Sequence, residues 1–205
     1  MTAPFNHLTL LIDSNHLKQG VKAIAQQIRA DLADQPEEAE PVMVVVLKGG
    51  ALFGVDLLRA LRRPMPVVFV PRSGAYESQV PGSDQALLRG RHLIVVDTLM
   101  DSGNTLRILY RWLETLEPAS IRLAVLLHKT VDSANPLIVN YLGYEVPDVR
   151  LVGYGLDEEE CFRGLPAVYT WWQAPSGNPF SPETVAACSD APKKKKSRRR
   201  DEQSC

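Results

Sequence analysis

Acidic residues and a loop of small polar residues follow an apolar run in the middle of the chain. The run spans Leu93 to Val96 and leads into Asp97, Asp101 and the loop from Ser102 to Thr105. This loop can direct several backbone N–H groups and two hydroxyls at an anion, and a helix that starts there adds the positive end of its dipole. Carboxylates next to a phosphate would repel it unless they bind something else, and sugar hydroxyls and Mg²⁺ are suitable partners. The segment is therefore predicted to bind a ribose phosphate.

Long apolar runs predict the strands that would position this loop. Continuous rather than alternating apolar character indicates strands buried on both faces, at residues 42–47, 91–96 and 121–127. Shorter strands are expected at 66–70, 136–142 and 150–154, and helices at 14–32, 52–61 and 105–116. This alternation predicts an α/β fold with a doubly wound, mainly parallel sheet flanked by helices. Ligands in such folds bind at the carboxyl ends of strands, so chemistry is expected just after Leu47, Val96 and Leu127.

Charge divides the chain into an acidic body and a basic carboxyl-terminal segment. Apolar residues make up 45% and charged residues 23%, which is ordinary for a soluble globular protein, and the net charge is -1. The segment from Lys193 to Arg200 holds seven basic residues, and without residues 175–205 the chain has 16 basic and 20 acidic residues. An acidic body gives no reason to expect nucleic-acid binding by the domain itself. We predict a folded domain at 1–174 and a disordered basic tail at 175–205.

Several classes of protein do not fit this sequence. Its three cysteines lack Cys-x-x-Cys spacing and are too scattered for a disulfide framework or a metal site. The first residues do not have the pattern of a signal peptide, and no stretch approaches the roughly 20 apolar residues of a membrane helix. A cytoplasmic protein that does not span a membrane is expected. The basic tail is open to several interpretations: a nuclear-localisation-like patch, contact with nucleic acid or a membrane surface, or a solubilising end.

Residues 97–106 (DTLMDSGNTL) resemble the motif that binds 5-phosphoribosyl-1-diphosphate (PRPP) in type I phosphoribosyltransferases. Residues 47–53 (LKGGALF) are similar to the diphosphate loop of hypoxanthine-guanine phosphoribosyltransferases, and residues 126–130 (LLHKT) to the segment whose lysine meets the purine 6-oxo group. Residues 144–166 are similar to the carboxyl-terminal signature of the same family. The resemblance covers roughly residues 8–172, and it implies the type I phosphoribosyltransferase fold with a small hood from the terminal segments.

The resemblance implies roles at the sugar-phosphate end of the site. Asp101 matches the catalytic acid/base, which lies near purine N7 and needs hydrogen-bond reach to the purine proton. Asp97 is expected to hold the ribose hydroxyls, directly or with Mg²⁺, and Thr98 to make one such contact through its hydroxyl. The alternatives are helix capping for Asp101 and an ordinary turn for the loop. The residues expected to bind the 5-phosphate are Ser102, Gly103, Asn104 and Thr105.

The diphosphate is expected to contact two further segments. Leu47, Lys48 and Gly49 form the matching loop, in which the Leu47–Lys48 peptide is expected to switch to cis when diphosphate binds. Arg163 is expected to pair with the diphosphate, because the planar guanidinium matches phosphate oxygens. Asp157 is expected to bind a Mg²⁺ that is held mainly by the diphosphate. The alternatives are a solvated lysine at position 48 and a local salt bridge between Asp157 and Arg163.

The purine base is expected to contact Lys129, Arg150 and Leu151. Lys129 would donate to the 6-oxo group and so select hypoxanthine or guanine over adenine, because a 6-amino group would face the ammonium with another donor. The alternative for Lys129 is an exposed charge at the end of a strand.

Three departures from the family pattern bear on catalysis. Thr98 stands where the family usually has a second Asp, and Arg150 stands where it has an aromatic ring stacked on the purine. A guanidinium plane can also stack on a base. The expected loop at 71–84 lacks the family's Ser-Tyr-Gly lid in place, and Ser73 and Tyr76 are the nearest substitutes.

These features support three hypotheses about function. The first is an enzyme that joins a 6-oxopurine to PRPP with Mg²⁺, as a homo-dimer or homo-tetramer like its family. The second is a catalytically weak regulator on the same fold that binds PRPP or nucleotides, with nucleic-acid contact through the basic tail. The third, a receiver-like signalling domain that uses Asp97 or Asp101 as phosphoacceptor, leaves the match at residues 144–166 unexplained.

Overall fold

A computed structural model of the chain describes residues 8–33, 41–72, 74–130 and 137–171. In chain order the elements are β1 (Leu8–Ile12), α1 (Ser14–Leu32), β2 (Val42–Val46), α2 (Ala51–Leu61), β3 (Val67–Val70), α3 (Tyr76–Gln79), α4 (Gly82–Leu88), β4 (His92–Met100), α5 (Asn104–Glu114), β5 (Ser120–Lys129), β6 (Tyr141–Val146), β7 (Leu151–Val152) and β8 (Val168–Trp171). The predicted basic tail at 175–205 lies outside the described residues. None of the helices in the described ranges has an apolar stretch long enough to cross a bilayer.

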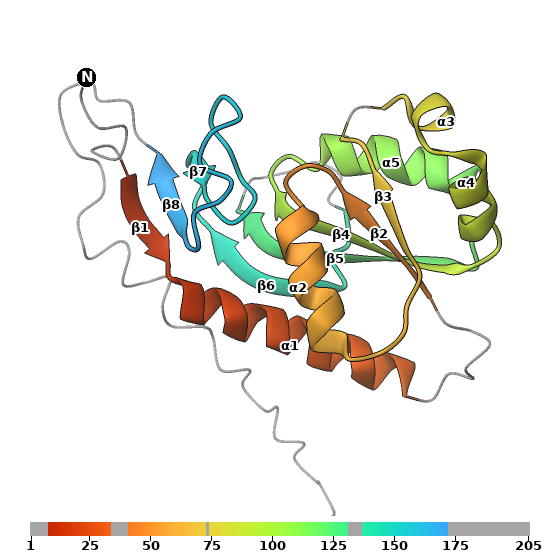
Figure 1. Cartoon of the computed structure of the whole chain (residues 1–205), viewed down its shortest axis with the longest axis horizontal. Coiled ribbons are helices and arrows are strands. Elements are labelled where there is room, and N and C mark those ends of the chain that lie inside the picture. Colours follow the sequence, from red (N-terminus) through yellow and green to blue (C-terminus); the bar gives the residue numbers. More distant parts are fainter. Residues whose placement is uncertain (1–7, 34–40, 73, 131–136, 172–205) are drawn as a thin grey trace, which may run out of the picture.

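Two sheets organise these elements (Figure 1). The larger sheet has five strands in the order β3-β2-β4-β5-β6, and every pairing in it is parallel. The smaller sheet has the order β1-β8-β7 with antiparallel pairings, and it joins the amino-terminal strand to the last described strand. The predicted parallel α/β sheet is confirmed, and the small sheet corresponds to the hood that the resemblance implies.

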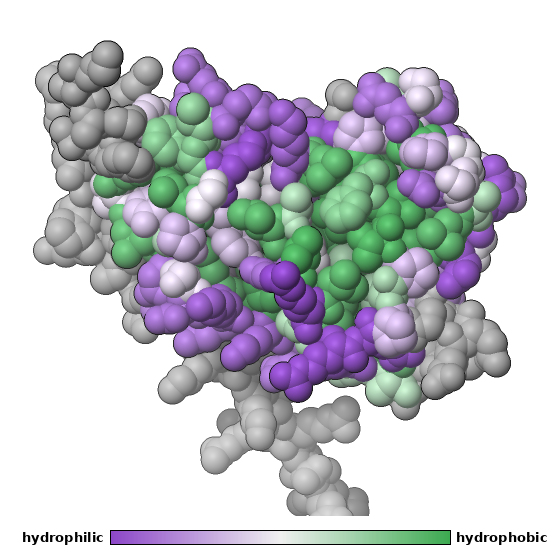
Figure 2. Space-filling view, in the orientation of Figure 1, coloured by the Kyte–Doolittle hydropathy of each residue, from purple (hydrophilic) through white to green (hydrophobic). Residues whose placement is uncertain are grey.

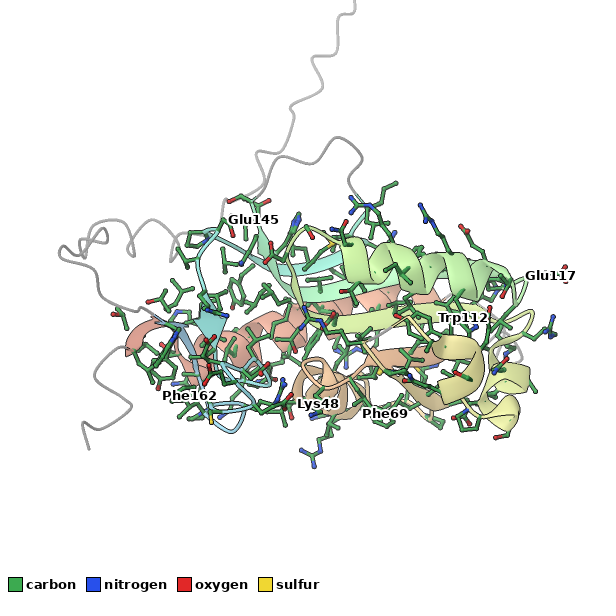
Figure 3. The ribbon with its side chains drawn as sticks, turned by 90° about the horizontal axis from the view of Figure 1, so that it is seen from above. Lys48, Phe69, Trp112, Glu117, Glu145 and Phe162 are labelled. Atoms are coloured by element: carbon green, nitrogen blue, oxygen red, sulfur yellow. The ribbon has the colours of Figure 1, made fainter. Side chains whose placement is uncertain are left out.

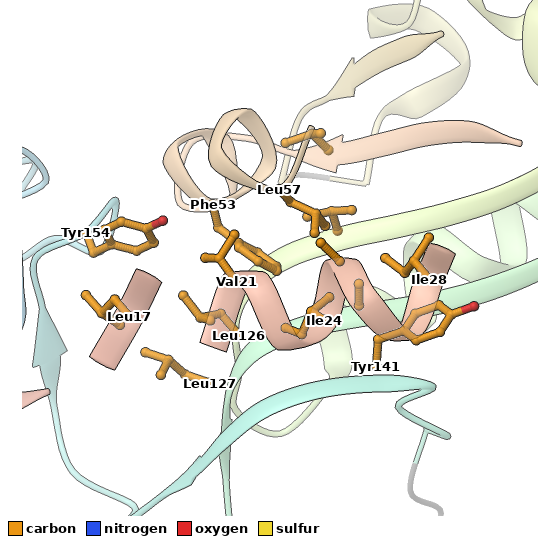
Figure 4. Packing of buried hydrophobic residues seen from close by; sticks show 14 of the residues in the cluster. Leu17, Val21, Ile24, Ile28, Phe53, Leu57, Leu126, Leu127, Tyr141 and Tyr154 are labelled. Atoms are coloured by element: carbon orange, nitrogen blue, oxygen red, sulfur yellow. The ribbon is translucent and has the colours of Figure 1, made fainter. Parts of the chain in front are cut away.

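Helices cover both faces of the larger sheet, which explains its continuous apolar strands. Met43 and Val45 of β2 pack in one cluster with residues of α1 and α2. Figure 4 shows side chains of α1 and α2 in this cluster. Val42, Val44 and Val46 point the other way, into a second cluster with α3, α4 and α5. All five side chains are buried. Because neither face of β2 meets water, both sets of alternating positions must be apolar.

Long strand pairing corrects the predicted boundaries near the site. β4 does not end at Val96 but continues to Met100, because it pairs with β5 up to Met100 and His128. Asp97 and Thr98 therefore lie within a strand, and their side chains point to opposite faces of the sheet. β6 spans Tyr141–Val146 rather than the predicted 136–142, since its pairing with β5 begins at Tyr141. Position 136 is not among the described residues.

Other differences concern short elements with weak sequence patterns. The segment predicted as a loop at 71–84 contains α3 and the start of α4. The hood strands β1 and β8 were not predicted as strands, because their burial depends on pairing with each other across 160 residues of chain. The predicted strand at 150–154 is reduced to Leu151–Val152, which pairs with β8.

Candidate active site

One cavity lies at the carboxyl ends of β2 and β4, where the fold class predicts a ligand. Its volume is about 230 Å³. Four segments far apart in the chain line it: residues 46–49 after β2, Arg72 after β3, Asp97 and residues 99–106 from β4 into α5, and Leu156, Asp157 and Arg163 from the connection between β7 and β8. The structure thus brings together the predicted ribose-phosphate and diphosphate segments.

The loop between β4 and α5 has the geometry of an anion site. α5 begins at Asn104 directly after Gly103, whose φ of 74° lies in the left-handed region that favours glycine. Arg107 holds the loop by donating to the Ser102 carbonyl at 2.7 Å and to Asn104 Oδ1 at 3.1 Å. Ser102, Gly103, Asn104 and Thr105 all line the cavity. The start of the helix and these small residues leave room for a phosphate.

Asp97 lines the cavity, and its carboxyl has an unusual ionisation. Burial raises its pKa to about 7, although the Thr98 N–H and the Arg72 guanidinium oppose the rise. The Thr98 N–H donates to Asp97 Oδ1 at 2.7 Å. A cation beside this carboxyl would favour its ionised form. Asp97 is thus suited to binding a metal ion or sugar hydroxyls.

Thr98 lies behind the cavity wall rather than in it. Its side chain is fully buried, and its hydroxyl donates to the Gly49 carbonyl at 3.0 Å. Thr98 is not among the residues that line the cavity. A hydroxyl used in this way ties the loop after β2 to β4, and the ribose contact expected of Thr98 is not made by the Thr98 side chain in this conformation.

We expect Thr98→Val to destabilise the protein by about 1–3 kcal/mol, because the partly buried Gly49 carbonyl loses its donor while the size of the side chain is unchanged. Urea denaturation measures this change. Thr130→Val is the control, since Thr130 is exposed and donates to the Val146 carbonyl only at 3.4 Å. Equal stabilities of the two variants would contradict the assigned role of the Thr98 hydroxyl.

The loop after β2 packs tightly against the connection between β7 and β8. The Leu47–Lys48 peptide bond is cis in the structure. Gly155 has a φ of 94°, and a Cβ added to it would lie 2.2 Å from the Gly49 carbonyl oxygen. The Gly49 carbonyl is thus enclosed by Gly155 on one side and the Thr98 hydroxyl on another.

Lys129 forms the centre of an ion-pair group at the end of β5. Its Nζ lies 2.8 Å from Asp101 Oδ2 and 3.1 Å from Asp148 Oδ1. Burial alone would lower the pKa of Lys129, but hydrogen bonds to the two carboxylates outweigh it and the pKa is raised. Lys129 is 8% exposed, so it is not the exposed strand-end charge of the alternative. Asp101 also lines the cavity and links this group to the phosphate loop.

Arg163 and Asp157, which also line the cavity, form an ion pair. Arg163 Nη2 lies 2.9 Å from Asp157 Oδ1 and 3.1 Å from Glu160 Oε2, and Nη1 donates to the Gly155 carbonyl at 2.8 Å. The buried Arg163 Nε has no hydrogen-bond partner among the described residues. Lys48 Nζ contacts the same Glu160 oxygen at 2.9 Å. The predicted diphosphate cations therefore lie close together around one carboxylate.

The residues predicted to contact the purine do not line the cavity. Leu151 is buried in β7, and the backbone carbonyl of Arg150 accepts from the Trp171 N–H at 2.8 Å. The Arg150 side chain is exposed, and its Nε lies 2.6 Å from Glu158 Oε2. Stacking of Arg150 on a purine remains a prediction.

The structure assigns Tyr76 to the core rather than to a lid. Its side chain is 1% exposed and stacks on Trp112 of α5, with ring centroids 5.1 Å apart. Figure 3 labels Trp112. Ser73 is outside the described residues. The Tyr76 ring therefore does not cover the cavity in this conformation.

Sequence reasoning missed three charged residues of the site. Arg72 follows β3 and lines the cavity near Asp97. Asp148 and Glu160 lie in segments that match the family, but no local pattern indicates their partners, Lys129 and Lys48. Each of these contacts joins segments that are distant in the sequence or in different loops, so only folding shows them.

The two predicted metal ligands fit a metal that arrives with the substrate. Asp97 and Asp157 both line the cavity, and they are the residues that would hold Mg²⁺. The described residues contain no group of three or more His, Cys, Asp or Glu side chains that could hold a metal by themselves. Mg²⁺ is commonly bound by one or two carboxylates together with substrate phosphates, which suits this arrangement.

The chain is similar in sequence and fold to known phosphoribosyltransferases. The chain is 31% identical to the hypoxanthine-guanine phosphoribosyltransferase of Aquifex aeolicus over 170 residues, covering 79% of this chain and 93% of that one. It is 30% identical to the hypoxanthine phosphoribosyltransferase of Salmonella typhimurium, covering 78% and 92%. The solved hypoxanthine phosphoribosyltransferase of Trypanosoma cruzi superposes with a TM-score of 0.70 at 27% identity, covering 80% and 95%. The phosphoribosyl transferase domain matches residues 10–159, and the chain belongs to this family.

Proposed function

We propose that the chain is a purine-salvage enzyme that converts hypoxanthine or guanine and PRPP to the nucleoside 5-monophosphate and diphosphate, with Mg²⁺. The observation that carries this proposal is the contact of Lys129 with Asp101 at the edge of a cavity that also contains the phosphate loop. One salt bridge thus joins the group expected to recognise the purine to the group expected to handle its proton. The relatives named above support the 6-oxopurine as substrate.

The proposed reaction transfers the ribose phosphate from diphosphate, the leaving group, to a purine nitrogen, the nucleophile. The bond from ribose C1 to the diphosphate oxygen breaks, and a purine nitrogen forms the new bond to C1. Asp101, as a carboxylate, would take the proton that the purine releases. Ser102 to Thr105 would hold the 5-phosphate, while Lys48 and Arg163 would bind the diphosphate as its charge develops. Mg²⁺, when bound with the diphosphate, would supply further neutralisation of that charge.

A spectrophotometric assay with PRPP, Mg²⁺ and each of hypoxanthine, guanine, xanthine and adenine tests the proposal. Turnover of hypoxanthine or guanine, with adenine rejected, is the expected result. Tight binding of PRPP without product from any base would instead support the alternative of a regulator on the same fold. The Thr98 hydroxyl donates to the Gly49 carbonyl and does not line the cavity, so the lack of the family's second Asp still supports that alternative.

The oligomeric state and location stay predictions from the sequence. Hydrophobic residues gather over α2 and β3 (Figure 2), and Leu52, Val55 and Phe69 there are 38–45% exposed. Such a face would suit a homo-dimer or homo-tetramer. A cytoplasmic location is likewise proposed.

We expect removal of residues 175–205 to leave kcat and KM unchanged. The residues of the proposed site all lie at or before Arg163, and the last described strand ends at Trp171. Steady-state kinetics of the full-length and shortened chains check this expectation. A loss of activity on truncation would show that the basic tail takes part in the site rather than forming an appendage.

A further inference from the structure

The turn that carries Glu160 has an unusual backbone. Glu159, Glu160 and Phe162 have φ angles of 48°, 63° and 70°, in the left-handed region that side chains other than glycine rarely adopt. The turn is closed by backbone bonds between Glu158 and Cys161. Unfavourable backbone conformations of this kind persist only where the surrounding structure fixes them, and they are common at ligand sites. The effect of this turn is to aim Glu160 back towards the cavity.

Glu160 bridges the two cations that are expected to bind diphosphate. Its Oε2 lies 2.9 Å from Lys48 Nζ and 3.1 Å from Arg163 Nη2. Lys48 and Phe162, two residues after Glu160, lie on the same side of the molecule in Figure 3. Lys48 and Arg163 line the cavity, whereas Glu160 does not and is 64% exposed. The exposed Glu160 carboxylate therefore contacts Lys48 and Arg163 from outside the cavity, where solvent leaves it room to move away.

The charge of Glu160 is maintained by the same contacts. Hydrogen bonds from Lys48 and Arg163 lower the pKa of Glu160. Exposed ion pairs of this kind are weak, since solvent screens them and their side chains lose freedom. A diphosphate carries more charge and offers several oxygens to the Arg163 guanidinium, so it forms the stronger pair.

We propose that Glu160 acts as an internal competitor of diphosphate: its carboxylate occupies Lys48 and Arg163 in the empty site, leaves when diphosphate binds, and returns as diphosphate departs. This inference rests on the proposed function, because it takes Lys48 and Arg163 as the diphosphate cations. In this role Glu160 weakens the binding of the product diphosphate. Release of diphosphate would be faster with Glu160 than without it.

The test compares Glu160→Gln with Glu159→Gln. Both variants remove one negative charge from the same exposed turn, and both residues have positive φ, but no contact of Glu159 with a cation of the site is seen. Isothermal titration of inorganic diphosphate, with and without Mg²⁺, gives the dissociation constants. We expect Glu160→Gln to bind diphosphate about 2- to 10-fold more tightly than the wild type, the gain expected from losing one or two exposed ion pairs. Product inhibition by diphosphate should strengthen in the same proportion.

The sign of the change separates the possible roles of Glu160. If Glu160 only positions Lys48 and Arg163, Glu160→Gln binds diphosphate more weakly or equally, and the proposal fails. An equal gain in Glu159→Gln would mean a general charge effect and would also overturn it. A wild-type chain that does not bind diphosphate at all would overturn the proposed function together with this inference. Tight wild-type binding with no gain in Glu160→Gln would overturn this inference alone.

Discussion

Asp101→Asn is expected to lower kcat by about 10²–10⁴-fold, the range usual for loss of a positioned acid or base. The amide keeps the size of the side chain and an oxygen for Lys129 to contact, but it cannot accept the purine proton at neutral pH. Lys129 would keep its contact with Asp148 at 3.1 Å, so the cation remains paired. Single-turnover kinetics with saturating PRPP and hypoxanthine measure the chemical step directly.

Asp148→Asn is the matched control for this prediction. Asp148 is the other carboxylate on Lys129, but it does not line the cavity. We expect its loss to change kcat far less than the loss of Asp101, because of the two carboxylates only Asp101 lines the cavity. The affinity for PRPP, measured by titration, should change little in Asp101→Asn. A kcat within tenfold of the wild type in Asp101→Asn would refute the assignment of Asp101 as the acid/base.

Gly155→Ala is expected to lower the free energy of unfolding by about 2–4 kcal/mol, from the cost of a left-handed alanine and the cost of overpacking. A Cβ at this position would lie 2.2 Å from the Gly49 carbonyl oxygen, so one of the two loops must move. Movement of Gly49 would displace the loop after β2, and we expect diphosphate binding to weaken as well. Urea denaturation and calorimetry with diphosphate measure the two effects.

Two other glycines separate the causes of this effect. Gly90 has a φ of 69° but nothing within 4 Å of its added Cβ, so Gly90→Ala reports the backbone cost alone, about 1–2 kcal/mol. Gly164 has open space and no positive φ, so Gly164→Ala should lie within about 0.5 kcal/mol of the wild type. If Gly155→Ala were no less stable than Gly90→Ala, the close approach of the two loops would not be a rigid feature.

Local sequence was sufficient for most of the large elements. The continuous apolar run at 42–47 predicted β2, and the three- and four-residue spacing of apolar positions predicted α1 and α2 close to their observed bounds. These patterns are readable because burial of a strand or of one helix face fixes the residue type at each position. The short elements α3, α4, β1 and β8 carried no comparable pattern, since too few of their positions are buried to produce one.

The sequence by itself determined where the phosphate loop lies, because Asp97 to Thr105 is one continuous segment whose turn chemistry and helix start are local. Through resemblance it also predicted that Lys48, Lys129 and Arg163 belong to one site. Lys48 and Arg163 line the cavity, and Lys129 contacts Asp101, which lines it. Only the tertiary structure decided what these residues contact. The pairing of Lys48 with Glu160 joins residues 112 apart, and the bond from Thr98 to the Gly49 carbonyl joins residues 49 apart. Such contacts depend on how strands and loops pack, and charge interactions act between neighbours in space rather than between neighbours in sequence.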